Sequence, residues 1–294
     1  MAALTPRPES SVVAVPPPGG GAGTWAGAPS AVRYGQEIFL AYRVRRPQGQ
    51  GRGYAVVIAR SADGESFEPI LTVGREEMNA ESLERPALAL TPDGHWRLYL
   101  SCATYGTKHW RVEVLEAAYP GAFDPRTAAV VLPGSQATAV KDPVIVHHDG
   151  RWHLWASVHP LADPAGTDRM TTEYALSRDG LQWTWQGTAL MPRPGEWDAR
   201  GVRVTAAQFT PAGVLAYYDG RATAAENFEE RTGVATGAAP DALAAVGSGP
   251  AAQSPAPPYG LRYLAIVDVG GGRHRLYYEL TRPDGSHDLR TELR

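Results

Sequence analysis

The chain has 294 residues, of which 43% are hydrophobic, and its formal net charge is −3. This apolar content is enough for a full core and excludes global disorder, while the small net charge gives no indication of nucleic acid or of an anionic membrane as a partner. The single cysteine, Cys102, excludes an intrachain disulfide.

The start of the sequence has no basic segment followed by an apolar one, so we expect no signal peptide. No window approaches the roughly 18 apolar residues of a membrane-spanning helix. These features together favour a cytoplasmic location.

The first 24 residues are interpreted as an entry segment that closes the fold. The stretch SSVVAV (10–15) predicts a strand, and the Pro- and Gly-rich stretch 15–24 follows it as a flexible connection. We expect this strand to pair with the last structural unit of the chain, because ring closure protects edges that otherwise invite aggregation.

An internal repeat fills the rest of the chain. Pro29, Pro86 and Pro143 open three similar stretches and are spaced 57 and 57 residues apart. The three stretches are 28–44, 85–103 and 142–159, and two weaker copies cover 202–220 and 261–281. Five units of this length account for the whole sequence.

Each unit reads as a strand, a tight turn and a second strand. A second hairpin is visible at 54–70 and 173–187, both with Ser-x-Asp-Gly at the turn, and the stretch 237–258 reads as a loop. Helical periodicity is almost absent. Four short strands per unit in five units predict an all-β fold, namely a single five-bladed β-propeller domain over residues 1–294.

The first strand of each unit should line the central channel of a propeller. The residue before the recurrent proline is Ala28, Arg85 and then Asp142, and the fourth unit offers Arg200 or Val202 at this position. The neighbouring residues are Glu84, Lys141 and Asp198. We therefore expect a ring of polar side chains. The simpler alternative for Asp142 is a turn residue before proline.

At these positions the sequence resembles the five-bladed propeller glycosidases of glycoside hydrolase families 43, 32, 62 and 68, and in motif style the β-mannoside phosphorylases of family 130. The resemblance rests on APSAVRYGQEIFLAYRVRRP with ARSADGESF, on VKDPVIV, and on WDARGVRVTAAQFTPAGVLAYYDG. It covers roughly residues 25–236 and implies the propeller fold and a carbohydrate substrate.

The catalytic positions depart from both family patterns. By resemblance to family 43, Ala28 stands where the base Asp is expected, Asp142 matches the pKa-modulating Asp, and Arg200 stands where the acid Glu is expected. By resemblance to family 130, Arg85 replaces the proton-donating Asp. Neither known catalytic set is complete.

Glycoside hydrolysis usually needs two carboxyl groups, one of which stays protonated. Lys141, Arg85 and Arg200 or Arg203 around Asp142 should lower its pKa, which suits a base or an orienting group. The acid should then come from Glu84 or from the segment 217–233, in which Asp219, Glu226, Glu229 and Glu230 are candidates. We select Asp142, Glu84 and Glu226 as catalytic candidates.

The arginines near the ring indicate an anionic ligand group, because the guanidinium fork matches phosphate and carboxylate. Ion pairing between blades is the alternative. Only Lys108 and Lys141 are lysines, which singles out the lysine beside Asp142. The predicted substrate-binding residues are Arg43, Arg85, Lys141, His159, Trp197, Asp198, Arg200, Arg203, Asp219, Arg221 and Asn227.

No metal site and no cofactor are expected, because the histidines of 147–159 alternate along strands and point to different faces. The sequence favours a carbohydrate-active, glycosidase-like enzyme with a modified carboxylate set. Its expected ligand is a small carbohydrate, and the arginines extend this expectation to anionic sugars and to a sugar with phosphate. The alternative is a non-catalytic sugar-binding or scaffold propeller. Catalytic activity, linkage and oligomeric state stay open at this point.

Overall fold

The structure is a computed structural model that describes residues 3–294, and it is an all-β fold. Twenty strands alternate with turns, and the helical elements in this range are five 3-10 segments of three residues each. These segments are η1 (Pro8–Ser10), η2 (Gln48–Gln50), η3 (Pro120–Ala122), η4 (Pro125–Thr127) and η5 (Ala224–Glu226). None of the helical segments in residues 3–294 has the length and apolarity needed to cross a membrane. The cytoplasmic location stays a prediction.

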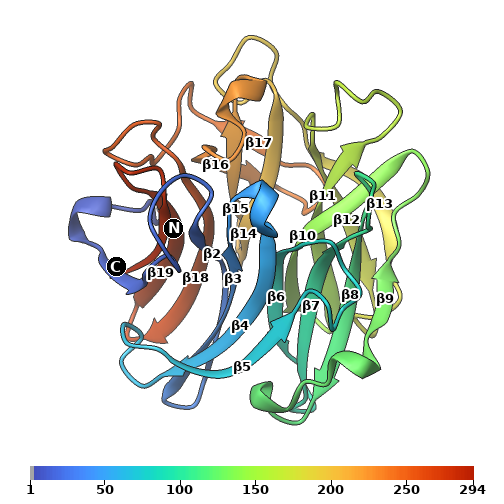
Figure 1. Ribbon diagram of the computed structural model, residues 1–294, viewed down its shortest axis with the longest axis vertical. Helices are drawn as coiled ribbons and strands as arrows, with labels where there is room; N and C mark the ends of the chain where they lie inside the picture. Colours follow the sequence, from blue (N-terminus) through green and yellow to red (C-terminus); the bar gives the residue numbers. More distant parts are fainter. Residues whose placement is uncertain (1–2) are drawn as a thin grey trace.

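The strands follow the sequence repeat in groups of four (Figure 1). The first repeat contains β2 (Trp25–Tyr34), β3 (Glu37–Arg45), β4 (Gly53–Ser61) and β5 (Glu68–Gly74). The second contains β6 (Leu83–Leu90), β7 (Trp96–Ala103), β8 (Trp110–Ala117) and β9 (Ala129–Leu132). The third contains β10 (Thr138–His148), β11 (Arg151–Pro160), β12 (Thr171–Ser177) and β13 (Thr184–Leu190).

The last two repeats follow the same order. The fourth contains β14 (Gly201–Thr210), β15 (Gly213–Arg221), β16 (Arg231–Gly237) and β17 (Ala244–Val246). The fifth contains β18 (Leu261–Gly270), β19 (Arg273–Thr281) and β20 (His287–Leu293). The N-terminal strand β1 (Val12–Val15) pairs antiparallel with β20, where the sequence analysis places it.

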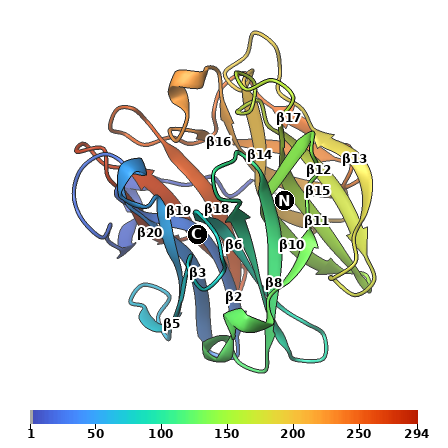
Figure 2. The same cartoon turned by 45° about the vertical axis from the view of Figure 1, so that its right-hand side comes forward.

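The second, third and fourth repeats are separate four-stranded sheets, while the fifth and first repeats form one eight-stranded sheet. The connection between these two repeats is the pair Trp25–His287 on β2 and β20. The first strands of all repeats contact one another in the order β2, β6, β10, β14, β18 and back to β2. They lie near the middle of the molecule in both views, as expected for a propeller (Figures 1 and 2).

Apolar side chains fill the spaces between neighbouring repeats. Phe39 and Ile58 of the first repeat pack with Leu98 and Leu115 of the second, and equivalent clusters join the other repeats. The alternation of side chains along each strand makes this possible, because each sheet presents one apolar face to each neighbour.

The Ser-x-Asp-Gly turns attach one repeat to the next. The Tyr277 hydroxyl donates to the Gly64 carbonyl at 2.9 Å, and the Tyr99 hydroxyl donates to the Gly180 carbonyl at 2.8 Å. Both tyrosines lie on the second strand of the adjacent repeat. The shared motif therefore has a structural use, because a buried carbonyl needs a donor.

Gly27 marks the tightest approach in the channel. A Cβ atom at this position would lie 2.1 Å from Oε2 of Glu279, a fully buried carboxylate that pairs with Arg43 and Arg262. The absent side chain of Gly27 therefore makes room for the Glu279 carboxylate.

We predict that Gly27→Ala lowers the free energy of unfolding by about 3 kcal/mol or more, because overpacking here also displaces a buried ion pair. Gly249→Ala is the matched control, since nothing lies within 4 Å of the added Cβ. Urea denaturation of both variants checks this, and equal stability of the two would contradict the packing argument.

Candidate functional site

The first two strands of every repeat bring one residue pair to the same end of the channel. These pairs are Gly27–Arg43, Glu84–Ser101, Lys141–Ser157, Arg203–Asp219 and Arg262–Glu279. Just after this level each inner strand has an irregular residue, and Ala28, Asp142 and Tyr263 adopt φ of 52°, 55° and 57° there. Such bulges bend the strand and re-aim its side chains. The result is a ring of polar side chains, but it lies one residue before the expected positions, so that Glu84 and Lys141 take the places expected for Arg85 and Asp142.

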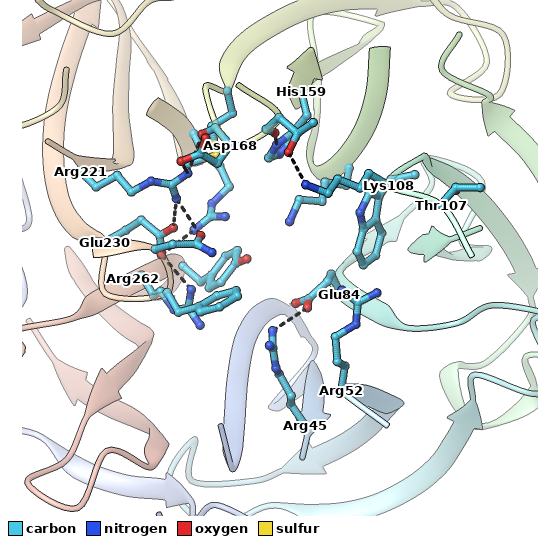
Figure 3. Close-up of a pocket in the computed structure, with 18 residues that line it drawn as sticks. Arg45, Arg52, Glu84, Thr107, Lys108, His159, Asp168, Arg221, Glu230 and Arg262 are labelled. Carbon is cyan, nitrogen blue, oxygen red and sulfur yellow. Dashed lines mark hydrogen bonds and ion pairs between the residues drawn. The ribbon is translucent and has the colours of Figure 1, made fainter. Parts of the chain in front are cut away.

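A cavity of about 210 Å³ opens above this ring (Figure 3). Its floor comes from the inner strands, and its walls come from the ends of the second strands and the loops that follow them. The lining residues are Arg45, Arg52, Glu84, Thr107, Lys108, Trp110, Lys141, His159, Thr167, Asp168, Met170, Arg203, Arg221, Asn227, Phe228, Glu230, Arg262 and Tyr263.

Glu84 is the carboxylate at the floor of the pocket. It pairs with Nη1 of Arg43 at 3.2 Å and with Nη1 of Arg45 at 3.2 Å. Burial disfavours its charged form, but Arg43, Arg45 and Lys141 outweigh burial and the pKa of Glu84 is lowered. Glu84 is therefore ionised near neutral pH. It can accept a proton or a hydrogen bond from a hydroxyl group, but it has no proton to donate.

Asp142 lies beneath the floor and its side chain is fully buried. Its Oδ2 is 3.5 Å from Nζ of Lys141 and 3.2 Å from Nη1 of Arg203. Burial opposes the charge, yet these cations prevail and the pKa of Asp142 is lowered, as the sequence predicts. Asp142 thus holds two cations that themselves line the pocket.

Glu230 carries the opposite wall, with Arg221 and Arg262 beside it (Figure 3). Its oxygens are 2.5 Å from Nη1 of Arg221 and 2.8 Å from Nη1 of Arg262. Burial opposes the charge of Glu230, but the neighbouring arginines outweigh burial and its pKa is lowered. Asp168 pairs with Arg200 at 2.6 Å and with Arg221 at 3.5 Å, and its pKa is also lowered despite burial. All three carboxylates of the lining are therefore held ionised.

Asp219 is the exception among the ring carboxylates. Burial raises its pKa to about 6, although Arg203 at 2.7 Å and the Tyr263 amide both favour its charged form. Its side chain is fully buried and does not line the pocket. Burial dominates because the Arg203 charge is shared with Asp142 and Glu230.

His159 lines the pocket as a neutral imidazole. Burial and Lys141 lower the pKa of His159 to about 3. Its Nδ1 lies 2.9 Å from the Thr167 carbonyl oxygen, which only accepts, so Nδ1 carries the proton and Nε2 accepts from Ser157 Oγ at 3.1 Å. His159 therefore adds no positive charge to the pocket, and both of its ring nitrogens have protein partners.

Cations exceed carboxylates around the pocket. Seven lining residues are Arg or Lys, against three carboxylates. Lys108 and Lys141, the two lysines of the chain, are both among them. Lys141 Nζ also lies 5.1 Å from the ring centre of Trp110. The lining itself therefore has more cationic than anionic side chains, while the buried Asp142 pairs with both Lys141 and Arg203.

The structure brings part of the predicted set together. Six of those residues line the pocket, namely Glu84, Lys141, His159, Arg203, Arg221 and Asn227. Arg43, Asp142 and Asp219 are buried in the channel next to it. Arg85 faces the other end of the channel and donates from Nη2 to the Thr205 carbonyl at 2.5 Å.

The remaining four predicted residues are also outside the pocket lining. Asp198 accepts from Arg193 and from the Tyr218 hydroxyl, and Trp197 stacks on Tyr218. Glu226 completes the capping box of η5 and pairs with Arg231 at 2.8 Å. Arg200 pairs with Asp168, and the ring position expected for Arg200 or Val202 is instead held by Arg203, opposite Asp219. That register assignment in the fourth repeat was therefore wrong.

The pocket also contains residues that sequence reasoning missed. Arg262, which is the fifth-repeat equivalent of Glu84 and Lys141, was missed altogether. Glu230 was among the candidates for the acid, but Glu226 was selected in its place. A repeat alignment anchored on the strand bulges would have found Arg262 and Tyr263. The remaining missed residues lie on strand ends and in loops that do not repeat, such as Arg52, Lys108, Asp168 and Phe228.

Comparisons with known proteins agree with this geometry at the level of fold. No family model and no curated protein matches the sequence. The structure is similar to a glycosyl hydrolase from Bacteroides ovatus (15% identity, TM-score 0.64, covering 98% of this chain and 89% of that one). It is also similar to the β-1,2-mannobiose phosphorylase of Listeria innocua (15%, 0.63, 98% and 91%) and to the GH43_1 enzyme of Xanthomonas citri complexed with xylose (13%, 0.68, 97% and 90%). The chain thus has the fold of the propeller glycoside hydrolases, as its motifs predict.

We predict that Asp142→Asn lowers the free energy of unfolding by about 3 kcal/mol at pH 7, because two buried cations lose their shared partner. The Asp142 pKa is depressed in the folded state, so its contribution is present above the ordinary value of 3.8 and is lost as the pH falls below it. The stability gap between wild type and variant should therefore narrow below about pH 4.

Asp149→Asn is the matched control. Asp149 also has a positive φ, 48°, but its side chain is 90% exposed. Thermal unfolding across pH 3–8 distinguishes the two variants. If Asp142→Asn is as stable as wild type, and the difference in their free energies of unfolding does not change with pH, Asp142 is no more than a turn residue.

Proposed function

We propose that the protein is a carbohydrate-active, glycosidase-like propeller that binds an anionic sugar, or a sugar together with phosphate, in the pocket at the channel mouth. The observation that carries this proposal is the set of seven cations against three ion-paired carboxylates around a cavity on a glycoside hydrolase fold. Arginine and lysine are the residues that proteins use for phosphate and carboxylate groups.

The fold supports five blades within this proposal. The eight-stranded sheet counts as two blades, because the single pair Trp25–His287 links its halves and each half has its own inner strand in the channel. The fifth blade is then completed by β1, in the manner of a ring that is closed by the two ends of its chain.

The charge state of the carboxylates bears on the reaction. Hydrolysis by two carboxyl groups requires one protonated acid, whereas Glu84, Asp168 and Glu230 all have lowered pKa values. Transfer of a glycosyl group to phosphate needs no carboxylate nucleophile. A phosphate oxygen forms the new bond to the anomeric carbon as the glycosidic bond breaks, and the proton of the hydrogenphosphate ends on the leaving oxygen. The cationic pocket therefore favours phosphorolysis over two-carboxylate hydrolysis, with Glu84 orienting sugar hydroxyls.

We predict that mannose 1-phosphate and glucuronate bind at least about tenfold more tightly than mannose and glucose, since charge-assisted hydrogen bonds are stronger than neutral ones. The difference should shrink as salt rises from low to molar concentration. Isothermal titration calorimetry measures both. Lys108→Met should weaken only the anionic probes, while Arg126→Met, at an exposed surface pair, should change nothing. Equal, salt-independent binding of neutral and anionic probes would refute the proposal.

A second candidate function is sugar binding without catalysis. It is favoured by the ion pairs that occupy every carboxylate of the lining. Incubation with β-mannosides in phosphate buffer separates the two candidates. An enzyme is expected to release a sugar 1-phosphate, and this release should fall by roughly 10² in Glu84→Gln. Tight binding of the anionic probes with no turnover in phosphate or water would favour the binding protein.

A further inference from the structure

Phe228 is an aromatic side chain in a pocket that is otherwise lined mainly by charged groups. It lies between η5 and β16, lines the cavity, and keeps 37% of its surface exposed. The binding of an anionic group does not by itself need an exposed phenyl ring. This ring therefore requires its own explanation.

The backbone of Phe228 is in an unfavourable conformation. Its φ of 78° is in the left-handed region, where a bulky residue is a genuine outlier. Glycine holds 18 such positions in the described part of the chain, so the sequence readily uses glycine where the backbone demands it. Strain of this kind is found at ligand clamps, where the side chain is needed in one place.

The surrounding contacts impose this conformation. Thr223 and Glu226 form a capping box around η5, and Asn227 accepts from Nη1 of Arg221 at 3.1 Å. On the other side, the Glu229 amide donates to the Glu226 carbonyl at 3.0 Å and Glu229 Oε2 accepts from Thr281 at 2.5 Å. Both neighbours of Phe228 are thus fixed, and the ring has a defined position.

The Phe228 ring packs against two guanidinium groups and one aromatic ring. The Arg45 guanidinium lies 4.6 Å from its centre, the Trp25 ring lies 5.2 Å away, and the Arg262 guanidinium lies 5.9 Å away. Trp25 is buried, and the Arg45 guanidinium lies 4.2 Å from its ring centre, so this cation contacts both aromatic rings. Phe228 keeps 37% of its surface exposed and is part of the cavity lining.

We propose that Phe228 is the platform on which the ring of the bound sugar stacks, while the anionic group of the same ligand meets the lysines and arginines of the pocket. This inference rests on the proposed function and narrows it to cyclic sugar acids and sugar phosphates. A pyranose has a face of C–H groups, and an aromatic face carries negative charge density that attracts them. An acyclic polyol phosphate offers the anion without such a face.

The test compares two phosphate probes by calorimetry. Mannose 1-phosphate has a ring, and glycerol 3-phosphate has none. Phe228→Gly should weaken binding of mannose 1-phosphate by about tenfold and leave glycerol 3-phosphate unchanged, because glycine removes the platform but keeps the cations. Lys108→Met should weaken both probes, since it removes part of the charge that they share.

The same variant controls for folding. Glycine adopts a positive φ without strain, so Phe228→Gly should melt at no lower temperature than Phe228→Ala. Tyr259→Gly is the matched control elsewhere, because Tyr259 has a φ of 75°, is 44% exposed and does not line the pocket. It should bind both probes as wild type does.

The outcomes separate the inference from the function on which it rests. If Phe228→Gly weakens both probes equally, or neither, while wild type binds them, the stacking role is overturned and the anionic pocket stands. If wild type binds neither probe, the proposed function fails, and the stacking role fails with it. Selective loss of the ring-bearing probe in a folded variant supports the platform.

Discussion

A nearly closed circuit of alternating charges in the channel determines how the rest of the molecule is arranged. Glu84 pairs with Arg43, Arg43 with Glu279, Glu279 with Arg262, Arg262 with Glu230, Glu230 with Arg203, and Arg203 with Asp142, which pairs with Lys141. All five repeats contribute to it. Removing such charges from water is costly, and the cost is offset only while every member keeps its partners. The circuit thus couples the repeats, because a shift of one inner strand leaves charges unpaired in two others.

The same circuit decides what the pocket can do chemically. Glu84 and Glu230 of the circuit, and Asp168 beside it, are turned toward arginines and have lowered pKa values. These three therefore do not form the usual arrangement of one protonated and one ionised carboxyl group. The cations have more donors than these carboxylates can accept. Nε of the buried Arg45 side chain, for example, has no hydrogen-bond partner among residues 3–294. Under the proposed function, the anionic group of the ligand would supply the missing acceptor.

The repeat made much of the architecture predictable from the sequence. Inner strands at 28, 85, 142, 202 and 261 fall within β2, β6, β10, β14 and β18, because proline spacing and turn glycines fix the phase of three repeats. The fourth repeat lacks the proline, and the phase slipped by a few residues, which moved the expected ring position from Arg203 to Arg200. A side-chain period of two makes such slips costly for site assignment.

The pocket rim was less predictable, because its residues come from loops that follow no repeat. Lys108 reaches the Thr167 hydroxyl of the next repeat at 3.2 Å, and this contact depends on two loop conformations that the sequence does not encode as a pattern. The one sequence feature that pointed to the pocket was the scarcity of lysine, because both lysines of the chain line it.

Several pocket residues have strained backbone conformations that depend on the contacts around them. The eight non-glycine residues with positive φ in the described chain include Arg52, Phe228 and Tyr263, and all three line the pocket. Such conformations persist only where the surroundings over-determine them. The paired charges below supply that constraint for Tyr263, whose amide donates to Asp219 at 3.1 Å and whose ring lies 3.9 Å from the Arg203 guanidinium. A weaker circuit would let the Tyr263 backbone relax, whereas the Phe228 backbone is held by the contacts of its neighbours Asn227 and Glu229.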